Sequence, residues 1–306
     1  TSTATTALTF SGLVGSETLG QTVASTFSDK NVGTGKTVTV NSITLADGTN
    51  GGLAVNYSIS AGQTATANIT AKPLTVSGIT TSNKTYDSTT STTLGTGSVS
   101  YGGLVSGDDF AGSYSGVFSD KNVGTGKTVN ITSSYSGSDV NNYSVTDQSS
   151  TTANITAKAL TASASASNKV YNSSSAATVT LSLSGFIGSE TVTSTNSSTF
   201  SDKNVATGKT VTVNSITLAN GSNGGLAANY SISTGQSTTA NITAKALTAG
   251  ASTSNKVYDG TSTATTALTF SGLVGSETLG QTVASTFSDK NVGTGKTVTV
   301  NSITLA

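Results

Sequence analysis

The chain has 306 residues, of which 34% are hydrophobic and only 9% are charged, and it contains neither Cys nor His. Its basic residues are all Lys and equal its acidic residues in number, so the net charge is zero. Nucleic-acid binding draws on a basic field, and thiolate or imidazole chemistry needs Cys or His, so the composition excludes both classes of function.

One stretch, Ser-Asp-Lys-Asn-Val-Gly-Thr-Gly-Lys-Thr-Val, begins at residue 28 and returns, with one change in one copy, at residues 119, 201 and 288. Successive copies are 82 to 91 residues apart. Recurrence at a nearly fixed spacing indicates an array of like modules. Residues 1–46 also recur letter for letter at 261–306, so we expect the sequence to be an excerpt of a longer array.

The spacing predicts modules of about 86 residues. Their expected bounds are 1–72 (partial, without its first strand), 73–158 and 159–245 (complete), and 246–306 (partial, without its last strands). A module of this size can bury a modest core of its own. Because almost no linker separates them, we expect each module to contact its neighbours in the same chain.

Alternation of hydrophobic and polar residues, which is typical of half-buried strands, recurs through the chain. It predicts strands at residues 8–12, 36–45, 64–71, 110–118 and 142–145. In the second of these the alternation slips by one residue at Asn41-Ser42, which predicts a β-bulge. No segment shows the three- and four-residue spacing of an amphipathic helix.

The last strand of each module is predicted to run almost directly into the next module. Its buried row is expected to be Ala65, Ala67, Ile69 and Ala71, after which the buried positions change to Leu74 and Val76. The same change of phase falls between Ala157 and Leu160. A one-residue shift turns every side chain to the other face of a strand, so this change marks the boundary between modules.

Six or seven short strands per module, with turn signals between them, predict an all-β fold. We expect a tandem array of antiparallel β-sandwich modules of immunoglobulin-like type that form an extended rod. The Tyr of Asn-Tyr-Ser, at residues 57, 143 and 230, is placed like a tyrosine corner, whose hydroxyl bonds to the backbone. A β-grasp-like module is the alternative, which the lack of a helical segment disfavours.

Four motifs recur in order: Tyr258-Asp259-Gly260-Thr261, the Asp-Lys-Asn-Val-Gly-Thr-Gly-Lys-Thr-Val stretch, Asn-Tyr-Ser, and Asn-Ile-Thr-Ala-Lys-X-Leu-Thr. Together they resemble the YDG-type repeats, and the related MBG repeats, of very large adhesins of Gram-negative bacteria. Ser88 and Ser173 replace the Gly of the first motif, which puts in doubt a backbone conformation open only to Gly. The resemblance implies export, a location on the cell surface or outside the cell, a stalk role and no catalytic residue.

Residues Gly33-Thr34-Gly35-Lys36-Thr37 end like a phosphate-binding P-loop. A P-loop has a further Gly five positions before the Gly-Lys pair and is followed by a helix. Here that position is Lys30, and a strand pattern follows. The glycines therefore predict a turn between strands.

Asp108 and Asp109, with Glu17, Glu190 and Glu277 at the matching place elsewhere, raise the alternative of a carboxylate pair or a calcium site. Calcium takes six to eight oxygen ligands, and the other modules carry one acid here, so we favour solvated turn residues. A Lys–Asn isopeptide bond would need Lys30 or Lys36 buried beside a catalytic acid, whereas both are predicted in loops.

We therefore expect a non-catalytic stalk or spacer in a bacterial extracellular adhesin or biofilm-matrix fibre that projects a distal binding region. No catalytic, cofactor-binding or metal-binding residue is assigned, and no cofactor is expected. The expected partners are neighbouring modules, with lateral self-association or a matrix polysaccharide in addition, and neither nucleic acid nor membrane insertion. The alternatives are a self-assembling extracellular filament or sheath, and modules that bind a glycan or a host protein directly.

Overall fold

The computed structural model describes residues 1–306, which form strands and three short 3₁₀ helices but no α-helix. None of its helices is long and apolar enough to cross a membrane. The contacts divide the chain into two compact units, residues 1–156 and residues 157–306. The all-β expectation is confirmed, and each unit is described by itself.

Residues 1–156 contain thirteen strands and two 3₁₀ helices. These are β1 (Thr3–Ala4), β2 (Leu19–Phe27), β3 (Gly33–Asp47), η1 (Ala54–Asn56), β4 (Thr64–Ile69), β5 (Lys72–Ser77), β6 (Thr80–Thr81), β7 (Lys84–Thr85), β8 (Leu94–Gly95), β9 (Ser100–Gly102), β10 (Ala111–Phe118), β11 (Gly124–Ser136), η2 (Val140–Asn142), β12 (Tyr143–Thr146) and β13 (Ser150–Thr156).

Residues 157–306 contain thirteen strands and one 3₁₀ helix. These are β14 (Lys158–Ala166), β15 (Lys169–Val170), β16 (Ala176–Ala177), β17 (Val179–Ser184), β18 (Val192–Phe200), β19 (Ala206–Asn220), η3 (Ala227–Asn229), β20 (Tyr230–Ile232), β21 (Ser237–Thr243), β22 (Thr248–Thr253), β23 (Thr263–Ala264), β24 (Thr266–Ser271), β25 (Gln281–Phe287) and β26 (Val298–Leu305).

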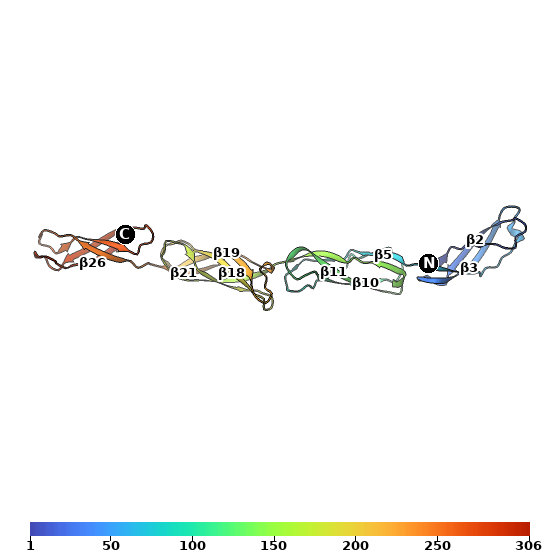
Figure 1. The fold of residues 1–306 in the computed structure, drawn as a ribbon, viewed down its shortest axis with the longest axis horizontal. Coiled ribbons are helices and arrows are strands. Elements are labelled where there is room, and N and C mark those ends of the chain that lie inside the picture. Colours follow the sequence, from blue (N-terminus) through green and yellow to red (C-terminus); the bar gives the residue numbers. More distant parts are fainter. The chain divides into compact units, whose positions relative to one another are not determined.

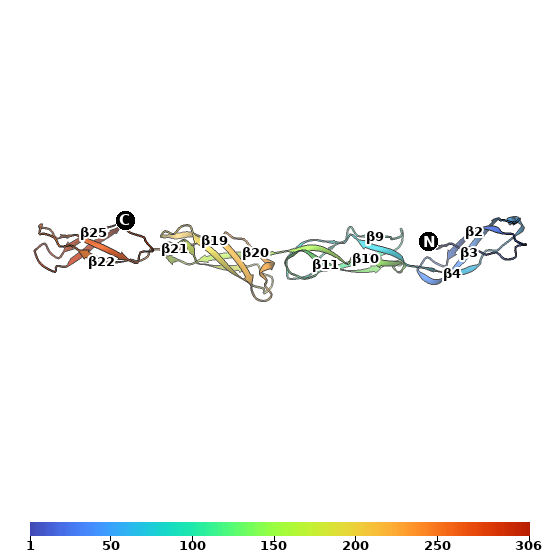
Figure 2. The ribbon, with the colours of Figure 1, turned by 45° about the horizontal axis from the view of Figure 1, so that its top comes forward.

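Long antiparallel pairs organise every module: β2 with β3, β10 with β11, β18 with β19, and β25 with β26 (Figures 1 and 2). Strands near the start of a module pair in parallel with strands near its end, namely β5 with β12, β7 with β13, β14 with β20, and β15 with β21. The expectation of antiparallel sheets is therefore confirmed for the long pairs and wrong for these four. These partners are distant in the chain, so a local hairpin pattern does not reveal their parallel pairing.

The core of residues 73–156 lies between two sheets, β12-β5-β9 and β10-β11-β13-β7. Leu74, Val76, Ile79 and Tyr143 are buried in it. Side chains of the second sheet, including Tyr114 and Ile131, pack against them. Residues 157–306 contain a corresponding core of Val179, Phe200, Val211, Val213, Ala240 and Ile242.

The predicted bulge is confirmed. Along β2 and β3, Ala24 pairs with Ser42 and the next residue, Ser25, pairs with Val40, so Asn41 is the extra residue. The change of burial phase at the end of a module is also confirmed. Ala153 and Ile155 are buried in β13, and the next buried position is Leu160 in β14.

Two expectations for residues 1–72 were wrong. Ala65 and Ala67 of β4 are exposed, and residues 8–12 form no strand. The counterparts of these segments are buried or paired elsewhere, since Ala240 lies in the core and residues 266–271, identical to 6–11, form β24 against β22. Within residues 1–72, β4 pairs with β3 alone, and no strand pairs with residues 8–12.

Candidate functional site

An acidic turn and the Tyr of Asn-Tyr-Ser are joined in each module that contains both. The Tyr143 hydroxyl donates to Asp108 Oδ2 at 2.6 Å, and the Tyr230 hydroxyl donates to Glu190 Oε2 at 2.7 Å. Tyr57 donates to Glu17 in the same way. We call this pair the acid–tyrosine turn.

The same hydroxyl accepts a hydrogen bond from the backbone. Val105 N–H donates to the Tyr143 oxygen at 3.0 Å, and Ile187 N–H donates to the Tyr230 oxygen at 3.2 Å. The hydroxyl thus bonds to the backbone, as expected for a tyrosine corner. The backbone donor, however, lies about 40 residues earlier in the chain, so each Tyr ties distant segments together.

The Asp-Lys-Asn-Val loop is fixed by the Lys that follows it in Gly-Lys-Thr. Lys127 pairs with Asp120 at 2.7 Å and Lys209 with Asp202 at 2.7 Å, and Lys36 pairs with Asp29. The hydrogen bond from Lys36, followed by one from the Asn31 N–H, holds the pKa of Asp29 below its ordinary value. Lys36 is therefore a partner of a loop carboxylate.

The Gly-Thr-Gly-Lys segment does not form the predicted turn, because it lies inside the start of strands β3 and β11, where the pairing register shifts between Gly33 and Lys36 and between Gly124 and Lys127. Its second Gly has a left-handed backbone, with φ of 61° at Gly35 and 58° at Gly126. The N–H of this Gly donates to the Asn side chain of Asn-Ile-Thr, at 2.8 Å to Asn68 and 2.7 Å to Asn154. Sequence reasoning missed this role of Asn, although the recurrence of Asn-Ile-Thr was a signal for it.

Lys30 lies where residues 1–72 meet residues 73–156. Its Nζ is 3.0 Å from Asp108 Oδ1 and 2.7 Å from Asp139 Oδ1. Beside it, Val32 N–H donates to Asn142 Oδ1 at 2.9 Å, and Asn142 Nδ2 donates to Asn31 Oδ1 at 3.1 Å. We call these six residues the junction: Lys30, Asn31, Val32, Asp108, Asp139 and Asn142. Lys30, Val32, Asp108 and Asn142 also line a cleft of about 140 Å³.

The junction pairs two carboxylates with one ammonium group. The Asp139 side chain is buried, whereas that of Lys30 is partly exposed. Hydrogen bonds from Tyr143 and then Lys30 lower the pKa of Asp108, and the hydrogen bond from Lys30 lowers the pKa of Asp139. The hydrogen bonds that Lys30 donates, to Asp139 first and to Asp108 second, raise the pKa of Lys30. Both carboxylates and the ammonium group are therefore charged together at neutral pH.

Asp109, the acid next to Asp108 in the sequence, has a different partner. Asp109 Oδ2 accepts the Ser138 N–H at 2.8 Å and belongs to the turn of its own module. The two adjacent acids therefore do not converge on one point. Sequence reasoning singled out Asp108 but missed Asp139, which has no acidic counterpart at the matching positions Leu53 and Leu226.

Within residues 157–306, a Tyr makes the contact from one module to the next. The Tyr171 hydroxyl, from the position of the Tyr in Tyr-Asp-Gly, donates to Glu277 Oε1 in the acidic turn of the following module. This hydrogen bond raises the pKa of Tyr171. In both units the acid of the acidic turn thus accepts a bond from the preceding module.

The Tyr-Asp-Gly motif itself is a turn around a Lys. Lys84 Nζ donates to Asp87 Oδ1 at 2.8 Å and lies 5.6 Å from the centre of the Phe118 ring. The backbone is left-handed at the last position of the motif in all three copies, with φ of 66° at Ser88, 65° at Ser173 and 77° at Gly260. The conformation is therefore kept where Gly is replaced by Ser.

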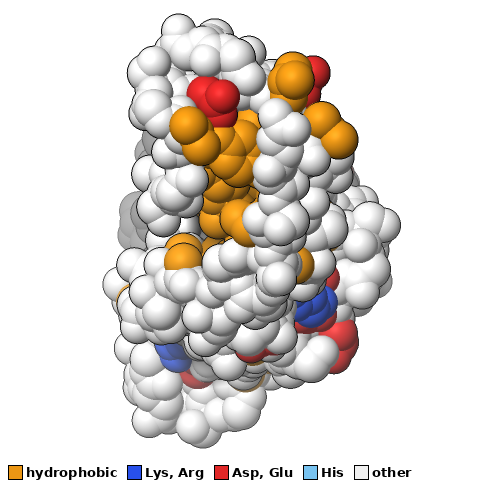
Figure 3. Space-filling view, turned by 90° about the vertical axis from the view of Figure 1, so that its right-hand side faces the viewer, with side chains coloured by type: hydrophobic (Ala, Val, Ile, Leu, Met, Phe, Trp, Pro, Cys, Tyr) orange, Lys and Arg blue, Asp and Glu red, His pale blue; other side chains and the backbone are white.

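Residues 1–72 carry an acid–tyrosine turn with exposed apolar neighbours. Val14, Leu53 and Val55 are exposed near Glu17 and Tyr57 in the sequence. Figure 3 looks toward this end of the unit and shows hydrophobic side chains gathered in one area with acidic side chains at its edge. In residues 73–156 the matching turn is the one that binds Lys30.

Comparison with known families accounts for the repeats. The family model of the YDG domain matches residues 1–67, 70–153, 156–240 and 243–306. No curated protein and no solved structure matches the chain. The four matches follow one another with gaps of only two residues, and together they take in nearly every residue. The chain therefore belongs to the YDG domain family and consists of four tandem copies of that domain.

Proposed function

We propose that this chain is a non-catalytic spacer whose modules form an extended stalk in a bacterial extracellular adhesin or biofilm-matrix fibre. The observation that carries the proposal is the junction. A spacer has to transmit orientation from one module to the next, and Lys30 and Asn142 link adjacent modules through directional polar bonds.

The short connection between modules supports the same function. β4 ends at Ile69 and β5 begins at Lys72, so few residues are free to act as a flexible hinge. With a rise of about 3.3 Å per strand residue, an immunoglobulin-like module would extend the stalk by roughly 35–45 Å. Length would then increase with copy number, while each module contacts chiefly its neighbours.

Direct binding of a glycan or a host protein by each module is less well supported. Aromatic side chains are the usual anchors of such interfaces. Most of those in the complete modules are turned inward, among them Tyr86, Phe118, Tyr143, Phe200 and Tyr230, which are all buried.

Small-angle scattering of chains with increasing numbers of modules tests the spacer. We expect the maximum dimension to rise nearly linearly with module number. A dimension that grows as for compact packing, or as for a flexible string, would contradict it. Reproducible binding of a matrix glycan by an isolated complete module would favour the direct binder instead.

A further inference from the structure

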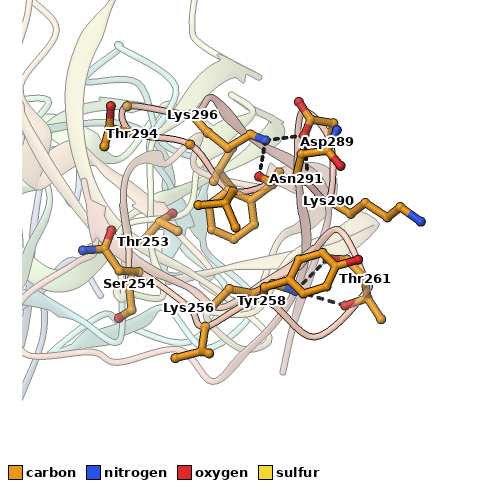
Figure 4. A pocket seen from close by; sticks show the side chains of 17 residues that line it. Thr253, Ser254, Lys256, Tyr258, Thr261, Asp289, Lys290, Asn291, Thr294 and Lys296 are labelled. Atoms are coloured by element: carbon orange, nitrogen blue, oxygen red, sulfur yellow. Dashed lines mark hydrogen bonds and ion pairs between the residues drawn. The ribbon is translucent and has the colours of Figure 1, made fainter.

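The Asp-Lys-Asn-Val loop is held together by one Lys and presents another. Figure 4 shows the copy of this loop in the last module, where Lys296 is bonded to Asp289 and Asn291 and the side chain of Lys290 points away from them. The identical loop of the first module makes the same two contacts. Its Lys30, at the position of Lys290, is therefore available to a neighbouring surface.

Residues 73–156 receive Lys30 at a carboxylate that is fixed in place. Asp139 is buried, its Oδ1 lies 2.7 Å from Lys30 Nζ, and its Oδ2 accepts the Asp109 N–H at 2.9 Å. Asn142 Nδ2 donates to the same Oδ1 at 3.2 Å. Because Asn142 also accepts the Val32 N–H, Asp139 is connected to the preceding module directly and through Asn142.

The connection that carries Asp139 is shorter than its counterparts. Residues 137–139 join β11 to η2, whereas residues 48–53 and 221–226 make the matching connections in the first and third modules. The last residue of each connection is Leu53, Asp139 or Leu226. Among the three modules that include this position, only the second therefore has an acid there.

Gly137 allows the short connection to lie against the acidic turn. Its φ is 123°, and a Cβ at this position would lie 2.2 Å from the Asp109 carbonyl oxygen. Any side chain would force the two segments apart. The close approach keeps Asp139 beside Asp108, so that both carboxylates reach the same ammonium group.

We propose that Asp139 is the specificity-determining residue of the junction, which it makes an ionic clamp for a loop that presents Lys. Its role, which rests on the spacer function proposed above, is to fix the orientation of two particular modules. Asp108 and Asp139 both face Lys30, so without Asp139 a single ion pair is left. The Lys30 side chain is 45% exposed, and dissolved salt screens an ion pair at such a site. The rigidity of the junction therefore depends on ionic strength.

Amide exchange of Val32 in the intact 306-residue chain measures opening of the junction, since its N–H donates to Asn142 across it. Val292 lies in an identical stretch of sequence and is 89% exposed, so its amide is the reference. We expect Val32 to exchange more slowly than Val292 at low salt. The ratio of the two rates should rise severalfold between about 0.01 M and 1 M salt, as the screening length falls from about 30 Å to about 3 Å. A ratio that is independent of salt overturns the clamp.

Asp139→Asn tests the charge, because it keeps the shape of the side chain and one acceptor oxygen. We expect Val32 to exchange about fivefold faster at low salt and to lose most of its dependence on salt. Lys30→Gln should have the same effect, whereas Lys30→Arg, which keeps the positive charge, should retain most of the protection. Lys290→Gln is the matched control and should leave Val32 unchanged. If the salt dependence survives in Asp139→Asn, the carboxylate has only a structural role and the proposal fails.

Failure of the clamp and failure of the spacer give different results. If Val32 exchange does not depend on salt while the maximum dimension still rises linearly with module number, the clamp is overturned and the spacer stands. If the exchange depends on salt as expected while the dimension does not rise linearly, the clamp is supported and the spacer is contradicted.

Discussion

At the scale of single residues, the acid–tyrosine turn explains why acid and Tyr recur together. The Tyr hydroxyl donates to a carboxylate and accepts a backbone N–H, so removal of one oxygen atom leaves two polar groups without that partner. In residues 157–243 both Tyr230 and Glu190 are buried. A buried polar group that loses its partner costs more than the bond itself contributes.

Tyr230→Phe is therefore expected to destabilise residues 157–243 by about 1–3 kcal/mol. The substitution keeps the ring and its packing but removes the hydroxyl between Glu190 and Ile187. Urea unfolding, followed through amide exchange of β19, would measure the loss. Tyr258→Phe, at a Tyr that is 58% exposed, is the matched control and should change stability little. Equal effects of the two substitutions would show that the hydroxyl at 230 has no special role.

The junction is expected to lose stability at acidic pH. The pKa values of Asp108 and Asp139 lie below the ordinary 3.8, so each carboxylate stabilises the junction above that pH. This contribution is lost as the pH falls through their lowered values, when protonation removes the charge that Lys30 binds. The Val32 amide, bonded to Asn142, is a probe in NMR spectra. Its signal should be constant from pH 5 to 8 and should shift only below pH 4. A transition near neutral pH would contradict this assignment.

At the scale of elements, the turns depend on left-handed backbone at fixed places. Gly260, Ser88 and Ser173 share this conformation at the end of the Tyr-Asp-Gly motif. A side chain is tolerated there, but an L-residue pays a steric cost for a positive φ. The glycine of this motif thus relieves strain in the turn that holds Lys256.

Gly260→Ala is expected to destabilise its module by about 1 kcal/mol. A Cβ at this position meets no atom within 4 Å, so the cost comes from the backbone and not from a clash. Gly250→Ala is the control, since Gly250 lies in β22 with a negative φ and equally open space. It should be neutral or slightly stabilising. Thermal unfolding of the two variants gives the comparison, and a loss at both sites would point to a need for space instead.

At the scale of the whole molecule, stability is expected to be local. Each of the two compact units has its own buried core, centred on Leu74 and Tyr143 in one and on Val211 and Phe200 in the other. In repeat proteins each module contacts chiefly its neighbours, so damage to one core need not spread.

Val211→Asp is expected to unfold the core of residues 157–243 and to leave residues 1–156 folded. Val211 is fully buried, so an unpaired carboxylate at this position would lose its hydration and destabilise the fold. Hydrogen exchange with mass spectrometry should show lost protection in β18 and β19 and unchanged protection in β10 and β11. Val257→Asp, at an exposed position, should change neither region. Simultaneous loss in both units would show that the chain folds as one cooperative body.

Local patterns in the sequence determined the all-β fold, the module repeat and the bulge. The alternation that slips at Asn41 predicted the extra residue correctly, because bulge and phase are properties of one strand. The strand after Gly-Thr-Gly-Lys was also predicted correctly, where a P-loop needs a helix, but the turn expected at these glycines is a register shift inside β3.

Only the tertiary structure decided which strands pair in parallel, which carboxylates form ion pairs with Lys30, and whether a given segment becomes a strand. Residues 6–11 and 266–271 are identical, yet only the second segment is a strand, because β22 lies beside it. Strand hydrogen bonds and burial need a partner that is distant in the chain. A sequence pattern states which residues are able to form a strand, and the partner decides whether they do.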